Sequence, residues 1–434
     1  MRTIMVSSKS AVGGQKSMAS REDGSCESST IIGNLKKEWL LSDMQVKQFL
    51  REGYLVVEDV LTDDELETAI EGFRRTLWKM AGVDMNDLEG TGKHLSQLSS
   101  TNGSGGVLDI FYPAWKLQLQ TNPKLFSIIS QLWYAMYCRS SKYHLSDDDD
   151  DSTEQVYRCH PFLSEELNDE FCCTTGYVHI DRVGYRLPTK LAQQLGKSKK
   201  RPLQRSLTPH LDCCPDTFYD TSSNKKTMWR PIQCFVSFTD TEIANTGGLE
   251  LVPKFHRNFH QWIHHRRPTA SDTAGSSNNN NNLHNHKSLC FGEYTHLRPM
   301  EDREVMKQIQ HIPVKAKSMV LWDYRLPHAN SYRNDCNIPR SVVYCSFLPN
   351  IPINRAYVEN VQLPNYISRN SPSSKSTTLW IKNSNSTNEN HSLIKKNDIV
   401  NETPSSESQL GSTEEEDFQF SELGAKLMGI DRWS

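Results

Sequence analysis

The sequence predicts a mainly β protein with flanking helices, an α+β fold whose core is built from antiparallel strands. Four short runs rich in β-branched and aromatic residues support this class. They are residues 232–239, 248–253, 318–324 and 341–348. Gly, Pro, Asn and Asp separate these runs, which is typical of an antiparallel sandwich or barrel and not of alternating strands and helices.

Helical patterns come before these runs. From Glu38 onward the residues predict a short helix, a strand at 54–57 and a second helix. Thr62 has the hydroxyl of a good helix N-cap, and three carboxylates follow it in the first turn, where the helix dipole favours negative charge. We therefore expect a helical N-terminal layer packed on the β core.

Composition divides the chain into one folded domain and several polar segments. Residues 1–36 and 370–417 are rich in Ser, Asn and charged groups, and they bury too little apolar surface to offset the entropy of ordering. We expect a disordered lead and a disordered linker there, and a disordered insert at about 268–290 around a run of asparagines. The domain then covers 37–369, and apolar residues at helical spacing predict a docking helix in 418–434.

The charge balance points to a small-molecule partner. The chain has 49 Lys and Arg against 52 Asp and Glu, a formal charge of −3, so no overall field favours nucleic acid. No apolar run reaches the roughly 18 residues of a membrane span. Eleven cysteines without a CxxC spacing favour reduced thiols and a cytoplasmic location. The Ser-rich start leaves organelle targeting open, and the oligomeric state is not determined.

Two histidines and one aspartate form the candidate metal site. His210 and Asp212 are two residues apart, so on an extended strand their side chains share one face. His328 follows a predicted strand much later in the chain and is placed to supply a third ligand. Two imidazoles and a carboxylate on one face of an octahedron leave three positions open, as Fe(II) requires to bind a bidentate cosubstrate and O2.

An HxD pair alone is more often a hydrogen-bonded pair on a strand than a metal site. Arg340 separates the two interpretations, because it leads a predicted strand twelve residues after His328. A guanidinium there can form a bidentate salt bridge with the distal carboxylate of 2-oxoglutarate. The alternative for Arg340 is an exposed surface arginine, since Arg is usually exposed.

Two other clusters of potential ligands are weaker candidates. His179 and Asp181 repeat the HxD spacing but lack a downstream histidine and arginine in the right order. We expect a pocket-wall strand there, with Arg182, Tyr185 or Arg186 available to a substrate. The histidines at 256, 260, 264 and 265 share a helical face, but a solvated helix is the preferred interpretation because no carboxylate or cysteine completes a site.

Several motifs in a fixed order resemble the phytanoyl-CoA dioxygenase family, particularly its uncharacterised eukaryotic branch. They are HLD, WRPIQCFVSFTD, NTGGLELVPKFH, LWDYRLPHANS and IPRSVVY. The opening GYLVVEDVLTDDELE and the tail FSELGAKLMGIDRW also resemble that branch. The similarity covers roughly residues 45–365 and the tail, with the Asn-rich insert as an interruption.

The resemblance implies a double-stranded β-helix, a cupin-like jelly roll with the metal at its mouth. It makes His210, Asp212 and His328 the Fe(II) ligands and catalytic centre, and Arg340 the anchor of the 2-oxoglutarate cosubstrate. It implies a dioxygenase that uses O2 to hydroxylate an unidentified organic small molecule, with release of succinate and CO2. A carboxylate at Asp212 favours hydroxylation over halogenation, because a small residue there would open a halide position.

The resemblance also suggests two further cosubstrate contacts. Asn330 lies where the family has a small polar contact, and Gln233 is placed to face the pocket, although a strand-surface amide is an equal alternative. The sequence departs from the family pattern at Cys213 and Cys214, thiols that an oxygen-activating iron would expose to oxidation. On a regular strand Cys213 points away from the metal and Cys214 toward it.

Two other functions fit the same residues. One is a catalytically silent jelly-roll protein that binds a ligand without turnover. The other is a metal-dependent hydrolase, in which zinc held by the same triad activates a water molecule. Arg340 disfavours the hydrolase, because hydrolysis does not use a dicarboxylate anchor.

Overall fold

Antiparallel sheets and helices make up the fold in the computed structural model, which describes residues 39–138, 141–144, 171–198, 201–213, 228–266, 295–370 and 418–433. The predicted lead at 1–36, the insert at about 268–290 and nearly all of the linker at 370–417 lie outside these residues. The described part thus contains strands and helices in the combination that the sequence predicts.

The larger sheet has six strands in the order β1-β10-β6-β12-β4-β2, all antiparallel to their neighbours. Its strands are β1 (Tyr54–Val57), β2 (Val107–Leu108), β4 (Val183–Arg186), β6 (Ile232–Ser237), β10 (Met319–Asp323) and β12 (Arg340–Tyr344). The central strands β6, β10 and β12 are buried along almost their whole length, so they form the middle of the core.

The second sheet has five short strands in the order β8-β5-β11-β7-β9. They are β5 (His210–Leu211), β7 (Leu249–Leu251), β8 (Thr295–His296), β9 (Gln310–His311) and β11 (His328–Asn330). From β4 to β12 the chain passes from one sheet to the other at nearly every step, so neighbours in sequence belong to different sheets. A separate pair, β3 (Gly176–Val178) with β13 (Phe347–Pro349), completes the strands of the described chain.

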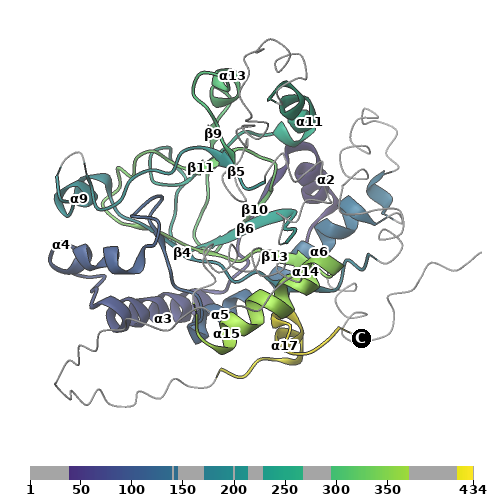
Figure 1. The fold of residues 1–434 in the computed structure, drawn as a ribbon, viewed down its shortest axis with the longest axis horizontal. Helices are drawn as coiled ribbons and strands as arrows, with labels where there is room; N and C mark the ends of the chain where they lie inside the picture. The colour runs from purple at the N-terminus through teal and green to yellow at the C-terminus, as the bar shows by residue number, and fades with distance from the viewer. Residues whose placement is uncertain are drawn as a thin grey trace, which may run out of the picture.

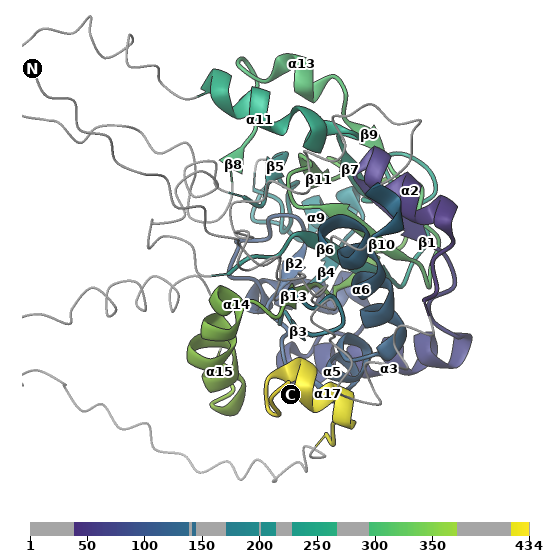
Figure 2. The same ribbon diagram turned by 90° about the vertical axis from the view of Figure 1, so that its right-hand side faces the viewer.

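Helices lie outside the two sheets. Figures 1 and 2 show α3, α5 and α6 with α17 beyond the six-stranded sheet, and α11 with α13 beyond the five-stranded sheet. The longer helices are α2 (Asp43–Glu52), α3 (Asp63–Ala81), α5 (Ala114–Gln120), α6 (Pro123–Tyr137), α11 (Phe255–Arg266) and α17 (Glu422–Met428). The shorter ones are α4 (Leu88–Thr91), η1 (Gly92–Leu98), η2 (Lys142–His144), α9 (Thr189–Gln194), α13 (Arg303–Met306), α14 (Pro352–Tyr357), η3 (Val358–Gln362) and α15 (Leu363–Ile367).

The N-terminal elements confirm the expected helix, strand and second helix. The Thr62 hydroxyl accepts from the backbone N–H of Glu65, and the Glu65 carboxylate accepts from the N–H of Thr62, which makes a capping box. Ser42 and Gln45 form the same arrangement at the start of α2. These local bonds satisfy backbone donors that a helix start leaves unpaired, so each helix begins where its cap lies.

The predicted strand at 341–348 is in fact two strands. Arg340–Tyr344 pairs with β4 and β6 in the larger sheet, whereas Phe347–Pro349 pairs with β3. Cys345 and Ser346 lie between them, and both are buried. The prediction of one strand was wrong because nearly all of these residues are buried, and a nearly continuous buried run does not show where the chain changes sheets.

The inner face of the six-stranded sheet is the face toward the five-stranded sheet. Opposed positions in the register place Gln233 and Phe235 of β6 on the same side as Trp322 of β10 and Arg340 of β12. The outer face is packed on helices: the Tyr185 ring in β4 contacts the Phe73 ring of α3 with centroids 5.3 Å apart. Polar residues of the inner face therefore meet in the space between the sheets.

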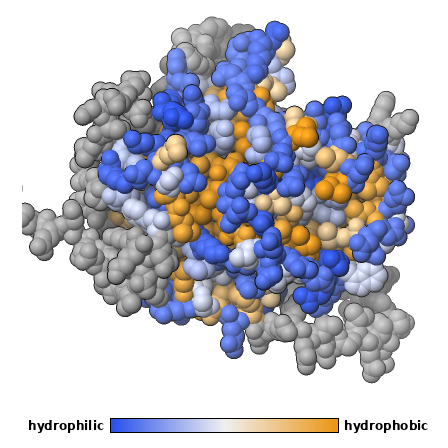
Figure 3. Space-filling model, turned by 180° about the vertical axis from the view of Figure 1, so that it is seen from behind, coloured by the Kyte–Doolittle hydropathy of each residue, from blue (hydrophilic) through white to orange (hydrophobic). Residues whose placement is uncertain are grey.

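Apolar residues also show at the surface. Seen from behind, they gather over the middle of the molecule with hydrophilic residues around them (Figure 3). The exposed large apolar side chains belong to separate elements, among them Met44 in α2, Trp78 and Met80 in α3, and Ile243, Met300 and Tyr332 in loops. Single exposed apolar side chains of this kind are ordinary in folded proteins.

One cysteine contradicts the expectation of reduced thiols. Cys172 is disulfide-bonded, whereas Cys234, Cys336 and Cys345 carry thiols. The error has a physical reason, because a disulfide requires two cysteines with a suitable geometry in the fold, and their number and spacing in the sequence do not show that geometry. A search of the described helices finds none with the length and apolarity needed to span a bilayer.

The C-terminal segment packs on the domain. Leu427 and Met428 of α17 are fully buried, and the Trp433 indole N–H donates to the Gly176 carbonyl at 2.8 Å. The helix ends at Gly429, whose positive φ of 79° suits a residue without a Cβ. Residues far along the chain thus cover β3, in agreement with the expected docking helix.

We expect Leu427→Ala to lower the free energy of unfolding by about 2–5 kcal/mol, because it removes a fully buried side chain and leaves a cavity. The matched control is Ile430→Ala, since Ile430 is exposed just past the same helix. Denaturant unfolding of the full chain measures both. Equal stabilities of the two variants would show that the helix does not dock in solution.

Candidate metal centre

His210, Asp212 and His328 come together at one end of the five-stranded sheet. His210 in β5 and His328 in β11 are directly opposite each other in the antiparallel register, and Asp212 follows β5 by one residue. One ligand atom from each of the three lies within 4.8 Å of the others. Among the described residues, this is the group of His, Cys, Asp and Glu side chains that is close enough to hold a metal ion.

The carboxylate lies between the two imidazoles. Asp212 Oδ1 is 3.4 Å from His210 Nε2, and Asp212 Oδ2 is 3.8 Å from His328 Nε2. The two imidazole rings have centroids 4.6 Å apart. Both histidines are nearly fully buried, whereas the Asp212 side chain is partly exposed.

Backbone contacts decide which nitrogen of each imidazole faces Asp212. His210 Nδ1 is 2.9 Å from the Thr208 carbonyl, and His328 Nδ1 is 3.0 Å from the Leu326 carbonyl. A carbonyl oxygen only accepts hydrogen bonds, so each Nδ1 carries the hydrogen. In the neutral form each Nε2 then presents its lone pair to the carboxylate, which is the tautomer that metal-binding histidines use.

Three acceptors facing one another require a positive charge between them. Burial opposes protonation of His210, but the hydrogen bond and charge of Asp212 outweigh it and raise the pKa of His210. Burial, together with the charge of His210, lowers the pKa of His328 to about 4. Burial would raise the pKa of Asp212, yet the hydrogen bond and charge of His210 and the charges of His328 and Arg230 lower it. These shifts favour a proton on His210 or a cation between the three side chains.

Two further side chains hold the Asp212 carboxylate. The Gln233 amide in β6 donates a hydrogen bond to Oδ2, and Arg230 Nη2 donates to the same oxygen at 3.4 Å. Gln233 was expected to face the pocket, with a strand-surface amide as the alternative, and the structure places it against Asp212. Arg230 was not singled out from the sequence, although it stands just before the Pro231 that precedes β6. The feature that could have pointed to Arg230 is that Asp181 and Asp212, the acidic residues of the two HxD pairs, each require a positively charged partner.

Arg340 lies on the same inner face and is buried. Its Nη1 donates to the Asn330 side-chain oxygen at 2.9 Å, and its guanidinium lies 4.9 Å from the centre of the Phe235 ring. Asn330 in turn donates to the Gly105 carbonyl at 3.1 Å. Among the described residues, Arg340 Nε and Nη2 have no partner at hydrogen-bond geometry, and the Tyr344 hydroxyl is the neighbour that partly offsets the lowering of the Arg340 pKa by burial. The structure thus brings Arg340 and Asn330 together and leaves one edge of the guanidinium open.

Of the three residues expected to be available to a substrate, one lies near Arg340. Arg186 is buried on β4, directly opposite Arg340 in the register. Arg182 forms a salt bridge with Asp109 at 2.7 Å, and Tyr185 packs on the helical side. Of the three alternatives the structure thus favours Arg186, because Tyr185 points to the opposite face of the strand and Arg182 is paired with Asp109.

The second HxD pair binds a guanidinium. Arg230 Nη1 donates to Asp181 Oδ2 at 3.1 Å and lies 3.3 Å from His179 Nδ1. Burial, and then the positive charge of Arg230, lower the pKa of His179 to about 3. Because Arg230 also contacts Asp212, it joins the two HxD pairs, and Asp181 has its cation without a metal.

The histidine stripe of α11 is only partly as expected. His256 is fully buried and its Nε2 is 3.1 Å from the Leu50 carbonyl, so it belongs to the core. Phe259 and Ile263 are buried on the same helix, so the interpretation of a solvated helix was wrong for this face. Among the described residues, neither His256 nor His260 belongs to a group of side chains close enough to hold a metal ion, and the side chains of 264 and 265 lie outside the described part.

Cys213 is buried in the hydrophobic core cluster, which fits its expected orientation away from the metal ligands. Cys214 lies outside the described residues. The structure therefore explains how one thiol of the pair is kept from the candidate metal centre.

No protein-family model and no curated protein matches the chain, so the resemblance to phytanoyl-CoA dioxygenases stays a prediction from sequence. Among solved structures, the chain is similar to GlcNAc Inducible Gene 2 of Candida albicans, with a TM-score of 0.48, 14% identity and coverage of 79% of this chain and 76% of that chain. EctD from S. alaskensis, solved with 2-oxoglutarate and 5-hydroxyectoine, has a TM-score of 0.40, 15% identity and coverage of 72% and 79%.

The non-heme alpha ketoglutarate dependent carbocyclase SnoK from nogalamycin biosynthesis has a TM-score of 0.37, 12% identity and coverage of 71% of this chain and 84% of that chain. These three TM-scores lie below 0.5. The proposals below therefore rest on the geometry of this chain.

We expect the affinity for Mn(II), a redox-stable substitute for Fe(II), to rise with pH up to the pKa of His210. The raised pKa of His210 means that a proton competes with the metal for Nε2 below that pH. The affinity then falls by about tenfold for each pH unit of acidification. Calorimetric titrations from pH 6 to pH 8, in two buffers of different ionisation enthalpy, measure the affinity and the protons released. A pH-independent affinity without proton release would contradict the site.

Gln233→Ala is expected to weaken Mn(II) binding by about 10- to 100-fold, because it removes a hydrogen bond that orients Asp212. Gln310→Ala is the control, since it makes the same chemical change at an exposed strand position. Both affinities come from the same calorimetric titration. A loss in the control as large as in Gln233→Ala would refute the specific role of Gln233.

Proposed function

We propose that this chain is a non-haem Fe(II)- and 2-oxoglutarate-dependent dioxygenase that hydroxylates an organic small molecule and releases succinate and CO2. The observation that carries the proposal is the convergence of His210, Asp212 and His328 near a buried arginine with an open edge. The protein would supply metal ligands at one end of the pocket and a carboxylate anchor at the other.

The strand order supports a double-stranded β-helix. Strands β4, β6, β10 and β12 belong to one sheet, and β5, β7, β9 and β11 to the other. Eight antiparallel strands in two sheets, with each sequence neighbour in the opposite sheet except for the antiparallel pair β7-β9, are the pattern of a jelly roll. In this arrangement β5 and β11 lie side by side, which is why residues 118 positions apart share one metal site.

The donor set fits Fe(II). Two neutral imidazoles and one carboxylate on one face of an octahedron leave three positions for a bidentate cosubstrate and O2. Bound ferrous iron would supply the oxygen activation that no side chain provides. The residues of the chain hold the site: Thr208 and Leu326 carbonyls orient the imidazoles, and Gln233 with Arg230 orients the carboxylate.

The distance between the metal ligands and the open edge of the Arg340 guanidinium suits a five-carbon dicarboxylate. His328 and Asn330 are two residues apart on β11, which is about 6.6 Å along a strand. Asn330 accepts from Arg340, so the open edge of this guanidinium lies on the order of one cosubstrate length from the metal ligands. Arg340 would therefore hold the distal carboxylate while the keto acid end lies at the metal.

The walls of the pocket limit water and other ligands. The Trp322 ring lies 5.1 Å from the His328 ring and is almost fully buried, so it shields one side of the ligands. Asp212 keeps more exposure than either histidine, which leaves access from its side. An acidic residue at this position also repels a halide, which favours hydroxylation.

The test is an anaerobic Fe(II) titration with and without 2-oxoglutarate, followed by exposure to air. We expect a weak visible metal-to-ligand charge-transfer band that appears only when Fe(II) and 2-oxoglutarate are both present. We also expect succinate to form after oxygen is admitted. Metal binding without a band and without succinate favours a silent binding protein. Zinc-dependent hydrolysis of ester or amide substrates without a need for 2-oxoglutarate favours the hydrolase.

His328→Ala and Asp212→Ala are expected to abolish succinate formation, because each removes a metal ligand. Arg340→Ala is expected instead to raise the 2-oxoglutarate concentration required by about 30-fold or more, since a buried charged partner of the carboxylate is lost. Steady-state assays over a range of 2-oxoglutarate concentrations measure the difference. Equal, modest losses in all three variants would count against these roles.

A further inference from the structure

The inner face carries two buried arginines side by side. Arg186 in β4 and Arg340 in β12 are opposite each other in the register, and such residues have Cβ atoms about 4.5–5.5 Å apart. They are 3% and 2% exposed. Within the described part of the chain no carboxylate contributes to the electrostatics of either guanidinium, although the Tyr344 hydroxyl offsets part of the effect of burial on Arg340. Burial with the charge of Arg340 lowers the pKa of Arg186 to about 10. Two like charges are thus buried together without a compensating carboxylate.

Much of the hydrogen-bonding capacity of this pair is unused. Arg186 Nη2 donates to the Tyr332 carbonyl at 3.3 Å, and Arg340 Nη1 donates to Asn330. Nε and Nη1 of Arg186 and Nε and Nη2 of Arg340 have no hydrogen-bond partner among the residues that the structure describes. Buried charged donors without acceptors are costly, so the four nitrogens point to an anionic ligand with several acceptor sites.

We infer that Arg186 is a second guanidinium for the distal carboxylate of the dicarboxylate cosubstrate, which would lie between Arg186 and Arg340. The inference rests on the proposed function, which needs only Arg340. Nε and Nη2 of Arg340 lie on one edge of the planar group and match the two oxygens of a carboxylate. An ionised carboxylate has about four lone-pair sites, so it can also accept from Arg186.

The position of Arg186 favours the cosubstrate over the substrate as its ligand. Gln233, which contacts the metal ligand Asp212, is in β6, and the strand order β6-β12-β4 puts Arg340 one strand away and Arg186 two. Neighbouring strands are about 4.8 Å apart. Arg186 therefore lies beyond Arg340 as seen from the metal, whereas the reacting carbon of a substrate must lie near the metal.

Little room remains around Arg186 for a larger group. A Cβ added at Gly247, which has a φ of +75°, would come within 3.3 Å of the Arg186 side chain. A Cβ at Gly106 would come within 2.8 Å of the Arg186 backbone. Backbone without side chains thus lies close to Arg186 at two positions, which leaves space there for a small group and not for a large one.

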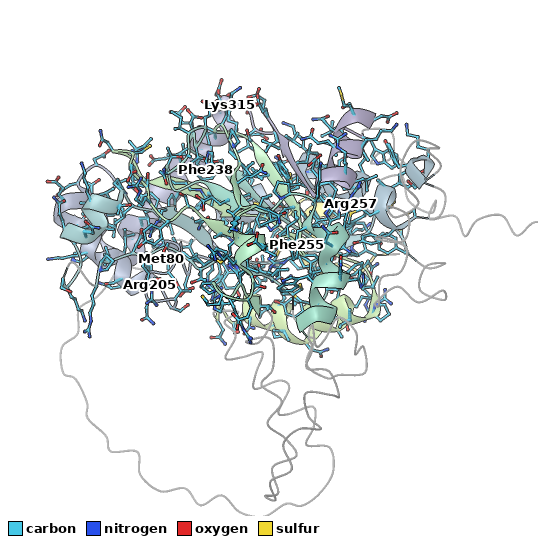
Figure 4. The ribbon with its side chains drawn as sticks, turned by 90° about the horizontal axis from the view of Figure 1, so that it is seen from above. Met80, Arg205, Phe238, Phe255, Arg257 and Lys315 are labelled. Atoms are coloured by element: carbon cyan, nitrogen blue, oxygen red, sulfur yellow. The ribbon has the colours of Figure 1, made fainter. Side chains whose placement is uncertain are left out.

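The test compares 2-oxoglutarate binding to the Mn(II)-loaded full chain in calorimetry under anaerobic conditions. We expect Arg186→Gln to weaken binding at least about tenfold, the effect of one lost charged hydrogen bond. Arg205→Gln is the matched control, because Arg205 is exposed and bonds only Ser104 among the described side chains (Figure 4). Its affinity should equal that of the wild type.

A second ligand, 2-oxobutyrate, and a second variant, Arg186→Lys, distinguish recognition of the distal carboxylate from a purely structural role of Arg186. 2-Oxobutyrate lacks the distal carboxylate, so Arg186→Gln should not weaken its binding. Arg186→Lys keeps the charge and should recover part of the affinity for 2-oxoglutarate. The inference is overturned if Arg186→Gln binds 2-oxoglutarate as tightly as Arg205→Gln, or if it loses the same factor for 2-oxobutyrate.

Glutarate distinguishes failure of this inference from failure of the proposed function. It carries both carboxylates but no keto group, so its binding to metal-free protein reports the arginine pair alone. If Mn(II) does not strengthen 2-oxoglutarate binding, the oxygenase proposal fails. In that case, weaker glutarate binding by Arg186→Gln than by the wild type would still support the two-arginine site. Equal glutarate affinities of the two proteins would overturn the inference.

Discussion

Two imidazole nitrogens and a carboxylate face one another in a buried space, and all three are acceptors. This arrangement is stable only with a positive charge at its centre, and much of the local structure serves to hold it. The antiparallel pairing of β5 with β11 sets His210 opposite His328. Backbone carbonyls two residues before each histidine fix the imidazole tautomers. Gln233 and Arg230 then hold the carboxylate between the rings.

The other end of the inner face, where Arg186 and Arg340 lie, requires a negative charge. Arg186 and Arg340 bury two positive charges with unused donors, while Asn330 and the Phe235 ring hold Arg340 in place. A cation at one end and an anion at the other would satisfy both ends of the space between the sheets. The proposed function follows from this complementarity, because a metal-chelating dicarboxylate meets both requirements with one molecule.

Sequence reasoning succeeded where the signal lies within a few neighbouring residues, or where several candidate ligands occur in a fixed order along the chain. Thr62 and its acidic followers predicted the start of α3, because a cap acts within three residues. The HxD spacing and a late histidine selected the residues that now lie together. It failed where the signal depends on spatial neighbours: His256 was expected on a solvated helix but fills the core. Arg230 stands in the motif WRPIQCFVSFTD but was given no role, although it contacts Asp181.

The sequence by itself determined the elements and the chemical types: antiparallel strands, helices with their caps, and an ordered set of His, Asp, His and Arg. Only the tertiary structure decided that Arg186 lies opposite Arg340 and that Arg230 joins Asp181 to Asp212. The physical reason is that backbone propensity and alternation act over a few residues. Register between strands and the burial of charge are set by partners that lie far away in the chain.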